Sequence, residues 1–470
     1  MRRPAAVFGC ALVAALLVGH LLRDTPGFVV RGENGDYHGD ITHYVYWTRL
    51  VTQGGIQSAY SGSWPETYAV YPPVSLYAYQ VVGGIYRLLE DPTFDPQRAQ
   101  RSAFLHEGIK AVALAFHLAT ALALFFLAGR LYGSAAGALA GSVYVLNPAA
   151  LYDVANWGQP DGAHALFSVL AVGALSLGWL ARAWCAMAVA ALAKPQAWSI
   201  LPLLSLATLR IAFFPGRQGS SNGAAVTDGA RLTGGFVACS RAGLAAASVA
   251  LVVVLPFILT GHLRDLLSLP RVISSVMPVV SADAHNFWWL VMRPLGQEPL
   301  FVEDSVRVLG PLSFRVLAGL LVLGSNAFAC WLYWTDRASL AESSGMAVLG
   351  WFVFTTQAHE NHLFFALPLL ALALPGRRRL FAPYAVMSVT LLLNMALHDE
   401  LVLEALGLPQ DGLLVGSLRV LNAAFNVSCF AAWSAWAALR PAPAGALVRV
   451  QPAAEQPRQL LLPGSSVRSS

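Results

Sequence analysis

Residues 108–129 read GIKAVALAFHLATALALFFLAG, and this stretch decides the class of fold. As an α-helix, its 22 residues would extend about 33 Å, which is enough to cross the hydrocarbon core of a bilayer. Lys110 is the only charged residue in it. A helix with so little charge is stable in lipid, where its backbone groups are satisfied internally. The stretch therefore predicts a transmembrane helix.

The composition of the whole chain supports the same class. Of the 470 residues, 56% are apolar and 12% are charged, whereas a soluble domain has about 25% charged residues. This excludes a conventional soluble enzyme. The formal net charge is +5, but the arginines are spread singly between apolar runs, so we expect no nucleic-acid partner. The five cysteines lack CxxC spacing and predict neither a disulfide framework nor a thiolate metal site.

We expect an all-α polytopic membrane protein with about twelve transmembrane segments. Besides 108–129, apolar runs predict segments at about 5–22, 134–151, 162–180, 240–260, 312–334, 339–357, 363–375, 380–397 and 414–438. A cleaved signal peptide is the alternative for 5–22, but no clear small-x-small cleavage site follows it, which favours an anchor.

The stretch between Arg182 and Arg210 is too short for two full spans and contains Lys194-Pro195-Gln196 at its middle. Pro195 cannot continue the hydrogen-bond ladder of a helix. The stretch therefore predicts a short helical hairpin with this tripeptide at its apex.

With a cytoplasmic N-terminus, the arginine-bearing connectors all fall on the cytoplasmic side, as the positive-inside rule requires. This topology gives a main transmembrane module at 1–380, C-terminal transmembrane helices at 381–439 and a disordered cytoplasmic tail at 440–470. Within the module we expect a large first extracytoplasmic loop at 24–107, a cytoplasmic linker at 211–238 and a second extracytoplasmic loop at 262–311.

Five polar groups then lie on the extracytoplasmic side, which predicts one outward-facing site. They are Gly39-Asp40, the run Trp157-Gly158-Gln159-Pro160-Asp161-Gly162, Lys194, the run Ala284-His285-Asn286-Phe287-Trp288-Trp289, and the run Gln357-Ala358-His359-Glu360-Asn361-His362.

Each group also has a simpler interpretation. Asp40 can be a solvated loop carboxylate, Asp161 a helix cap and Trp288 a residue of the interfacial belt. Lys194 at membrane depth costs about 2.5–3.5 kcal/mol unless it is paired, so we expect an anionic partner, with snorkelling to the interface as the alternative. His359 and His362 are three residues apart, not four, and lack an obvious third ligand, which disfavours zinc.

These motifs resemble those of the integral-membrane GT-C glycosyltransferases. The first loop is similar to that of the endoplasmic-reticulum glucosyltransferases that use dolichyl-phosphate-glucose, through Gly39-Asp40, Tyr44, Trp47 and Tyr71-Pro72-Pro73-Val74. Later motifs of those enzymes resemble Asn286-Phe287-Trp288 and His359-Glu360. Trp157-Gly158-Gln159 with Asp161, and Lys194-Pro195-Gln196, resemble motifs of bacterial and archaeal relatives and of the GPI-anchor mannosyltransferases. The resemblance covers about residues 30–370.

The resemblance implies a GT-C-like fold with its catalytic module at 1–380. It implies inverting transfer of a hexose, mannose or glucose, from a polyprenyl-phosphate carrier to a hydroxyl of a glycan or lipid-linked acceptor. Asp40 matches the family's catalytic base, which suits a carboxylate that accepts the proton of an alcohol. By the same likeness, Lys194, His359 and His285 would bind the donor phosphate, and Gln159, Asp161, Trp288, Glu360 and Tyr71 the sugar or acceptor. The resemblance implies no required cofactor, and it does not exclude a divalent cation.

Two points remain open at this stage. The loop of the glucosyltransferases usually carries an acidic residue two positions after the base, where this chain has Thr42, while Asp36 and His38 precede Asp40; Asp40 is favoured over Asp36. A transporter or a lipid-linked sugar flippase is the alternative function, although no repeat between the two halves is clear. The abundance of Arg, Ala and Gly is typical of a high-GC bacterial genome and predicts the plasma membrane, with an extracytoplasmic site.

Overall fold

The computed structural model describes residues 2–23, 39–62, 68–214 and 228–441. In this part of the chain nearly all regular structure is helical, and strands β1 (Arg307–Leu309) and β2 (Leu312–Ser313) form a single antiparallel hairpin. Seven of the described helices are long and apolar enough to cross a membrane, or eight if one bent pair counts as a span. The chain is thus an all-α integral membrane protein, as predicted, while the number of twelve spans stays a prediction.

Apart from α11 (Asp228–Leu259), which begins 12 residues before the predicted segment 240–260, the long apolar helices lie close to the predicted segments. They are α1 (Arg2–Arg23), α5 (Ala103–Tyr132), α10 (Leu201–Phe213) with the 3-10 helix η3 (Pro195–Ile200) before it, α11, α15 (Phe314–Trp334), α18 (Phe381–Ala396) and α20 (Leu413–Ala438). The bent pair is α6 (Ser134–Val145) with α7 (Pro148–Leu151) and the π-helical turn η2 (Tyr152–Asn156), and it bends by 52°. Pro148 begins the second half, because its ring cannot continue the preceding helix.

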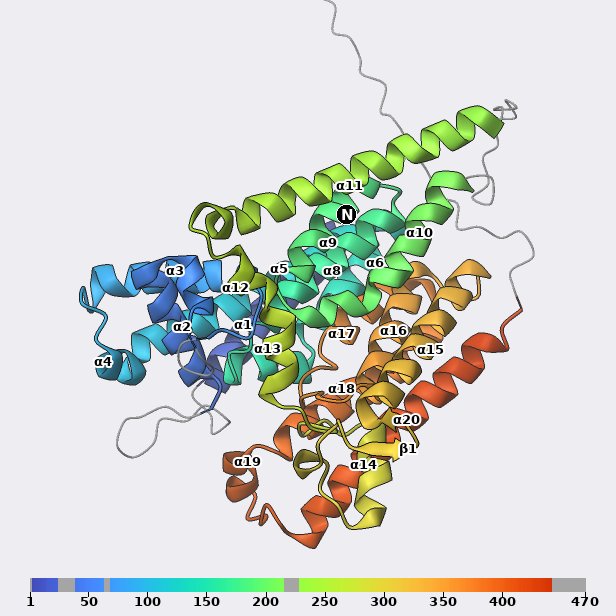
Figure 1. Ribbon diagram of the computed structural model, residues 1–470. Helices are drawn as coiled ribbons and strands as arrows, with labels where there is room; N and C mark the ends of the chain where they lie inside the picture. Colours follow the sequence, from blue (N-terminus) through green and yellow to red (C-terminus); the bar gives the residue numbers. More distant parts are fainter. Residues whose placement is uncertain (1, 24–38, 63–67, 215–227, 442–470) are drawn as a thin grey trace, which may run out of the picture.

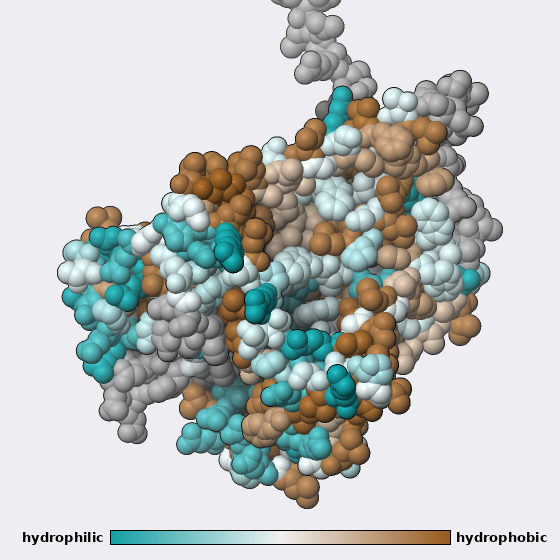
Figure 2. All heavy atoms as spheres, viewed as in Figure 1, coloured by the Kyte–Doolittle hydropathy of each residue, from teal (hydrophilic) through white to brown (hydrophobic). Residues whose placement is uncertain are grey.

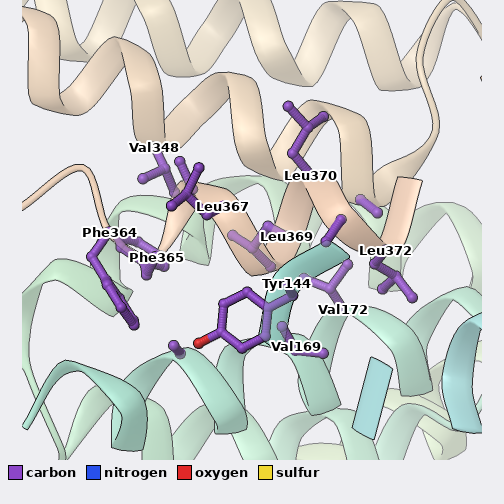
Figure 3. Close-up of a cluster of buried hydrophobic side chains, with 14 of the residues drawn as sticks. Tyr144, Val169, Val172, Val348, Phe364, Phe365, Leu367, Leu369, Leu370 and Leu372 are labelled. Atoms are coloured by element: carbon purple, nitrogen blue, oxygen red, sulfur yellow. The ribbon is translucent and has the colours of Figure 1, made fainter. Parts of the chain in front are cut away.

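Four shorter apolar helices complete the bundle. They are α8 (Asp161–Ser176), α9 (Leu180–Ala191), α16 (Leu340–Phe354) and α17 (Ala366–Ala373). Every residue of α17 is buried, and Figure 3 shows its leucines packed with Val348 of α16, Val169 and Val172 of α8, and Tyr144 of α6. A helix that is apolar on all sides is buried either in a protein core or in lipid. Since α17 is too short to span lipid alone, it is a core helix.

The hairpin predicted around Lys194 is present. Helix α9 ends at Ala191, η3 begins at Pro195, and the side chain of Trp184 donates a hydrogen bond to Thr208 Oγ1 at 2.9 Å. Trp184 lies 11 positions before Pro195 and Thr208 lies 13 positions after it, so the contact joins the two arms of the hairpin. The second arm, with η3 and α10 together, is long enough to span, so the hairpin is longer on this side than predicted.

The first loop folds into helices α2 (Ile41–Gly54), η1 (Ile56–Tyr60), α3 (Pro73–Leu89) and α4 (Pro96–Arg101), which gather at one side of the bundle in Figure 1. Buried aromatic side chains, among them Trp47, Tyr79 and Phe94, form a core of their own there. Phe257 at the end of α11 and Leu266 of α12 (Leu263–Leu267) complete this core, so the loop is fastened to the membrane helices.

The second loop contains α12, α13 (Leu269–Val276), α14 (Phe287–Met292) and the β1–β2 hairpin, and the short helix α19 (Glu400–Ala405) lies near α14 in Figure 1. Figure 2 shows hydrophilic side chains over the first loop and α19, and hydrophobic ones over α11. On α11, Leu244, Val252 and Leu259 are each about 70% exposed or more, which is typical of a helix that faces lipid.

Two predicted boundaries need correction or fall outside the described residues. The linker expected at 211–238 is shorter, because α10 continues to Phe213 and α11 begins at Asp228; residues 215–227 lie outside the described part. Helix α11 begins before the apolar run at 240–260, because Gly and Ala residues continue the helix toward its N-terminus. A prediction of spans from hydropathy leaves these weakly apolar residues out. The disorder predicted for 440–470 falls almost wholly on residues 442–470, which also lie outside it.

Basic and polar groups occupy opposite ends of the same helices. At the start of α16, buried Glu342 contacts Arg440 at 2.6 Å and Arg377 at 3.5 Å, and at the end of α10 Arg210 binds Asp336 at 2.6 Å. The other ends of these helices, at Pro195 and Thr355, lie on a cavity. The 15 residues of α16 separate the two ends by about 22 Å.

Candidate active site

A cavity of about 490 Å³ lies where three of the predicted polar groups meet. The first loop, the hairpin apex, α13 and the segment between α16 and α17 form its walls. Its lining residues are Asp40, His43, Tyr44, Trp47, Val70, Tyr71, Gln159, Pro195, Gln196, Trp198, Ser199, Ile273, Val276, Met277, Trp351, Thr355, Thr356, Gln357, His359, Glu360, Asn361 and His362. Asp40, Gln159, Tyr71, His359 and Glu360, all predicted from the sequence, thus share one space.

Asp40 stands at the N-terminus of α2, immediately after Gly39, whose φ of 84° favours glycine. Its side chain does not cap the helix, although aspartate commonly does so. Instead, Oδ2 accepts a hydrogen bond from Gln159 Nε2 at 2.7 Å. Among the described residues no hydrogen bond to Oδ1 is present, so this oxygen can accept a proton or a further hydrogen bond.

Gln159 connects the first loop to the membrane bundle. Its Oε1 accepts a hydrogen bond from Tyr44 at 2.6 Å, and its backbone N–H donates to Asp153 O at 3.1 Å. Gly158 before it has a φ of 70°, and a Cβ there would lie 3.0 Å from Lys110 Cγ, so only glycine fits this turn without strain. Gln159 is 1% exposed and is positioned to orient Asp40.

Lys194 has the anionic partner that its depth requires. Its Nζ donates a hydrogen bond to Asp161 Oδ1 at 2.7 Å, and the two side chains are 4% and 1% exposed. Asn361 donates to the other oxygen of Asp161 at 2.9 Å. Lys194 itself does not line the cavity, because the ring of Tyr71 lies between, with its centroid 5.1 Å from Nζ. The expectation that Asp40, His359 and Lys194 all border the cavity is therefore met only by the first two.

Aromatic side chains link Asp40 to Lys194. The hydroxyl of Tyr44, which binds Gln159, lies 3.4 Å from the hydroxyl of Tyr71. Burial raises the pKa of Tyr71 to about 12, so its hydroxyl keeps its proton and can donate a hydrogen bond. One chain of contacts therefore runs from Asp40 to Lys194 on the same side of the molecule.

His359 and Glu360 face the cavity from the segment between α16 and α17. The His359 side chain is 39% exposed, whereas that of Glu360 is 12% exposed. Burial raises the pKa of Glu360 to about 8, with smaller contributions from Asp283 and Asp40, because a charged carboxylate is poorly solvated there. At neutral pH Glu360 thus carries its proton and can donate a hydrogen bond, while burial lowers the pKa of His359.

His362 holds the turn that carries these two side chains. Its Nδ1 accepts a hydrogen bond from the backbone N–H of His359 at 3.1 Å, and its Nε2 lies 2.8 Å from Gln196 Nε2 of the hairpin apex. The apex and the 359–362 turn are therefore fixed to each other.

His285 and Trp288 lie away from the cavity. His285 is fully buried, with Nε2 2.9 Å from His398 Nε2 and Nδ1 2.9 Å from Asn422 Nδ2. Trp288 donates to Phe354 O at 2.9 Å and is 3% exposed. The run 284–289 contacts the wall of the cavity from outside the lining, because Asn286 Nδ2 donates a hydrogen bond to the backbone oxygen of the lining residue Thr355 at 3.2 Å.

The sequence did not single out several residues of this site. Three of them, Gln196, Asn361 and His362, lie in the predicted motifs, next to the predicted site residues Lys194, His359 and Glu360. His43 lies one turn after Asp40 on α2, a signal that helical spacing could have given. Trp351 and α13 carried no signal in the sequence. In the described part of the chain, no three His, Cys, Asp or Glu side chains group as metal ligands, so the structure assigns none.

No protein-family model and no curated protein matches the chain. Among solved structures, it is similar to ArnT from Cupriavidus metallidurans bound to undecaprenyl phosphate, with a TM-score of 0.48 and 13% identity over 91% of this chain and 76% of that one. It is also similar to the archaeal oligosaccharyltransferase AglB from Archaeoglobus fulgidus in complex with an inhibitory peptide and a dolichol-phosphate. The TM-score is 0.39 and the identity 12%, over 93% of this chain and 56% of that one. Such values describe a partial likeness in the arrangement of helices and assign no activity.

Proposed function

We propose that the chain is an inverting glycosyltransferase of the GT-C type, which transfers a sugar from a polyprenyl-phosphate carrier to an acceptor hydroxyl. The observation that carries the proposal is the environment of Asp40. This carboxylate belongs to the motif that resembles the catalytic loop of that superfamily, it lines a cavity of about 490 Å³, and Gln159 holds only one of its two oxygens.

The chemistry needs one base. The acceptor hydroxyl gives its proton to Asp40 while its oxygen bonds to the anomeric carbon, and the bond from that carbon to the phosphate oxygen breaks with inversion. The polyprenyl phosphate leaves as an anion and requires no proton. Hydrogen-bond donors that face the leaving oxygen lower the barrier, because negative charge grows there in the transition state.

His359 and the protonated Glu360 are the donors that we assign to the phosphate and sugar. Both line the cavity with Asp40. Lys194 lies behind the wall of the cavity: it pairs with Asp161, which also accepts a hydrogen bond from Asn361 of the same turn. Its proposed effect on the phosphate is therefore indirect. The structure offers no such argument for His285 or Trp288.

The shape and polarity of the cavity suit an amphipathic donor. Ile273, Val276 and Met277 add apolar side chains to a lining that also contains polar groups of the first loop. Trp198, also on the lining, is 41% exposed and is placed to contact a prenyl chain that enters from the bilayer. Tyr71 and Trp351 line the cavity and are only partly buried, so we assign them to contacts with the sugar ring. Mannose and glucose are the hexoses proposed, on the resemblance of the motifs.

The distribution of charge supports the proposed side of the membrane. Glu342, Arg377 and Arg440 cluster at the end of α16 opposite to the cavity. Arginine-rich connectors stay in the cytoplasm, so we place the cavity on the extracytoplasmic side, in the plasma membrane of a bacterium. A glycan or a lipid-linked acceptor would reach it from there.

The test is transfer by the purified protein, with polyprenyl-phosphate mannose and glucose as donors and a panel of glycan and lipid-linked acceptors. We expect Asp40→Asn to lower transfer by about 10²–10⁴-fold. Asp95→Asn is the matched control, because Asp95 is an exposed cap of α4 in the same loop and asparagine caps equally well.

Three results would contradict the proposal. Wild-type transfer by Asp40→Asn excludes Asp40 as the base, and Asp36→Asn, tested in parallel, then shows whether the earlier carboxylate serves. Movement of lipid-linked sugar across vesicles by a wild-type protein that transfers nothing indicates a flippase. Absence of transfer and movement with every donor and acceptor rejects both functions.

A further inference from the structure

A further buried carboxylate, Asp304, lies in the second loop, outside the lining of the cavity. Its side chain is fully buried. Arg315, at the start of α15, donates from Nε to Oδ2 at 2.9 Å and from the terminal nitrogen to Oδ1 at 2.6 Å. Oδ2 also accepts from Thr356 Oγ1 at 3.1 Å and from Gln357 Nε2 at 2.8 Å. Four donors therefore converge on one carboxylate.

Gln357 has a backbone conformation that needs such support. Its φ is 60°, in the left-handed region that side chains other than glycine rarely adopt. Its backbone N–H donates to Val279 O at 3.1 Å, and its side chain binds Asp304 and, at 3.3 Å, Ser274 O. A residue in this region persists only when its surroundings hold it there.

The turn at Gln357 decides where the next residues point. After it, Ala358 pairs with Ala282 through the backbone, and His359 and Glu360 reach the lining of the cavity that also contains Asp40. Relaxation of Gln357 to a negative φ would redirect the chain immediately before these two side chains.

We propose that Asp304 is a positioning residue: by holding Gln357 in the left-handed conformation, it sets His359 and Glu360 against Asp40. The effect of Asp304 on the reaction rate rests on the proposed glycosyl transfer. Only an acceptor can serve four donors, and the amide of asparagine would present its own N–H₂ group to Arg315 or Gln357. The role therefore requires a carboxylate and not merely a polar side chain of that size.

The first test is Asp304→Asn, measured as kcat and KM for the donor. Small displacements of a reacting group reduce the rate strongly, so we expect kcat/KM to fall about 10- to 100-fold, mainly in kcat. Asp336→Asn is the matched control, since it removes the carboxylate of another Asp–Arg pair, at the opposite end of α15 and far from the cavity. It should stay within about twofold of wild type by the same reasoning.

The second test separates positioning from simple support. Gln357→Gly and Gln357→Ala both remove the side chain from the cavity, but only glycine adopts the left-handed conformation freely. We expect Gln357→Gly to retain more activity and a higher unfolding temperature than Gln357→Ala. The double variant Asp304→Asn with Gln357→Gly should recover part of the activity and stability that Asp304→Asn loses, because glycine no longer needs the restraint.

The unfolding temperatures keep this inference distinct from the proposed function. If the wild-type protein transfers no sugar, the proposed function fails, while the order of Gln357→Gly, Gln357→Ala and the double variant still tests the restraint. If Asp304→Asn does not accumulate in membranes, the two Gln357 variants carry the test. Wild-type kinetics in Asp304→Asn, or a glycine variant no better than the alanine one, overturns the inference.

Discussion

Gln159 donates a hydrogen bond to Asp40 across 119 positions of the chain, with 2.7 Å between Nε2 and Oδ2. The bond ties the first loop to the turn that begins α8, and the second oxygen of Asp40 accepts no hydrogen bond from the described residues. The same amide accepts from Tyr44 at 2.6 Å, so Gln159 cannot rotate without losing both bonds.

Replacement of Gln159 by leucine should therefore impair catalysis more than binding. We expect kcat to fall about 10- to 100-fold while the KM of the donor changes little, because Asp40 loses its orientation. Steady-state transfer assays measure both values. Gln53→Leu on α2 is the control, since the Gln53 amide bonds only to Thr93 O and is exposed. A rise in the KM of the donor with an unchanged kcat would instead assign Gln159 to substrate binding.

Removal of Lys194 should destabilise the protein. In Lys194→Met the carboxylate of Asp161 stays buried without its counter-ion, which costs about 3–5 kcal/mol. Thermal unfolding in detergent measures this loss, and Lys194→Met with Asp161→Asn should recover much of it. Glu298→Gln, which breaks the partly exposed pair with Arg293, should cost less than about 1 kcal/mol. A stable Lys194→Met protein with a raised donor KM would assign Lys194 to the phosphate itself.

The pH dependence of transfer should report the titration of the Glu360 carboxyl group. Its pKa is raised to about 8, so the protonated form that donates a hydrogen bond prevails below this pH and disappears above it. The rate should decline as pH rises through about 8, and Glu360→Gln, which donates at all pH values, should lose this decline. Because the folded protein binds this proton more tightly than the unfolded chain, stability also falls as pH rises toward 8. An unchanged profile in Glu360→Gln would remove Glu360 from the reaction.

Gly158→Ala should lower both stability and activity. The φ of 70° strains any alanine there by about 1–2 kcal/mol, and the new Cβ would press on Lys110 and shift Gln159. Gly178→Ala is a close control, because Gly178 has a φ of 78° but no atom within 4 Å of the Cβ position. Both variants should lose similar stability from strain, whereas only Gly158→Ala should lose transfer activity. Equal activities in the two variants would contradict the placement of Gln159 by Gly158.

The apolar runs of the sequence were enough to predict the class of fold and most helices. Lipid sets the length and polarity of a span, so hydropathy alone locates α5, α15 and α20 to within a few residues of the observed ends. The hairpin around Pro195 was also predictable, because proline limits the helix locally. The length of α11 was not, since its first turns contain few strongly apolar residues.

The sequence by itself also determined which chemical groups are available and that Asp40, Gln159, Lys194 and His359 lie on one side of the membrane. The tertiary structure alone decided their partners: it paired Lys194 with Asp161 behind the ring of Tyr71, buried His285 against His398, and brought Gln196 to His362. Hydropathy fixes the depth of a side chain because the bilayer is a uniform solvent for every helix. Hydrogen bonds and ion pairs form over about 3 Å between residues far apart in the chain, so they depend on how the helices pack.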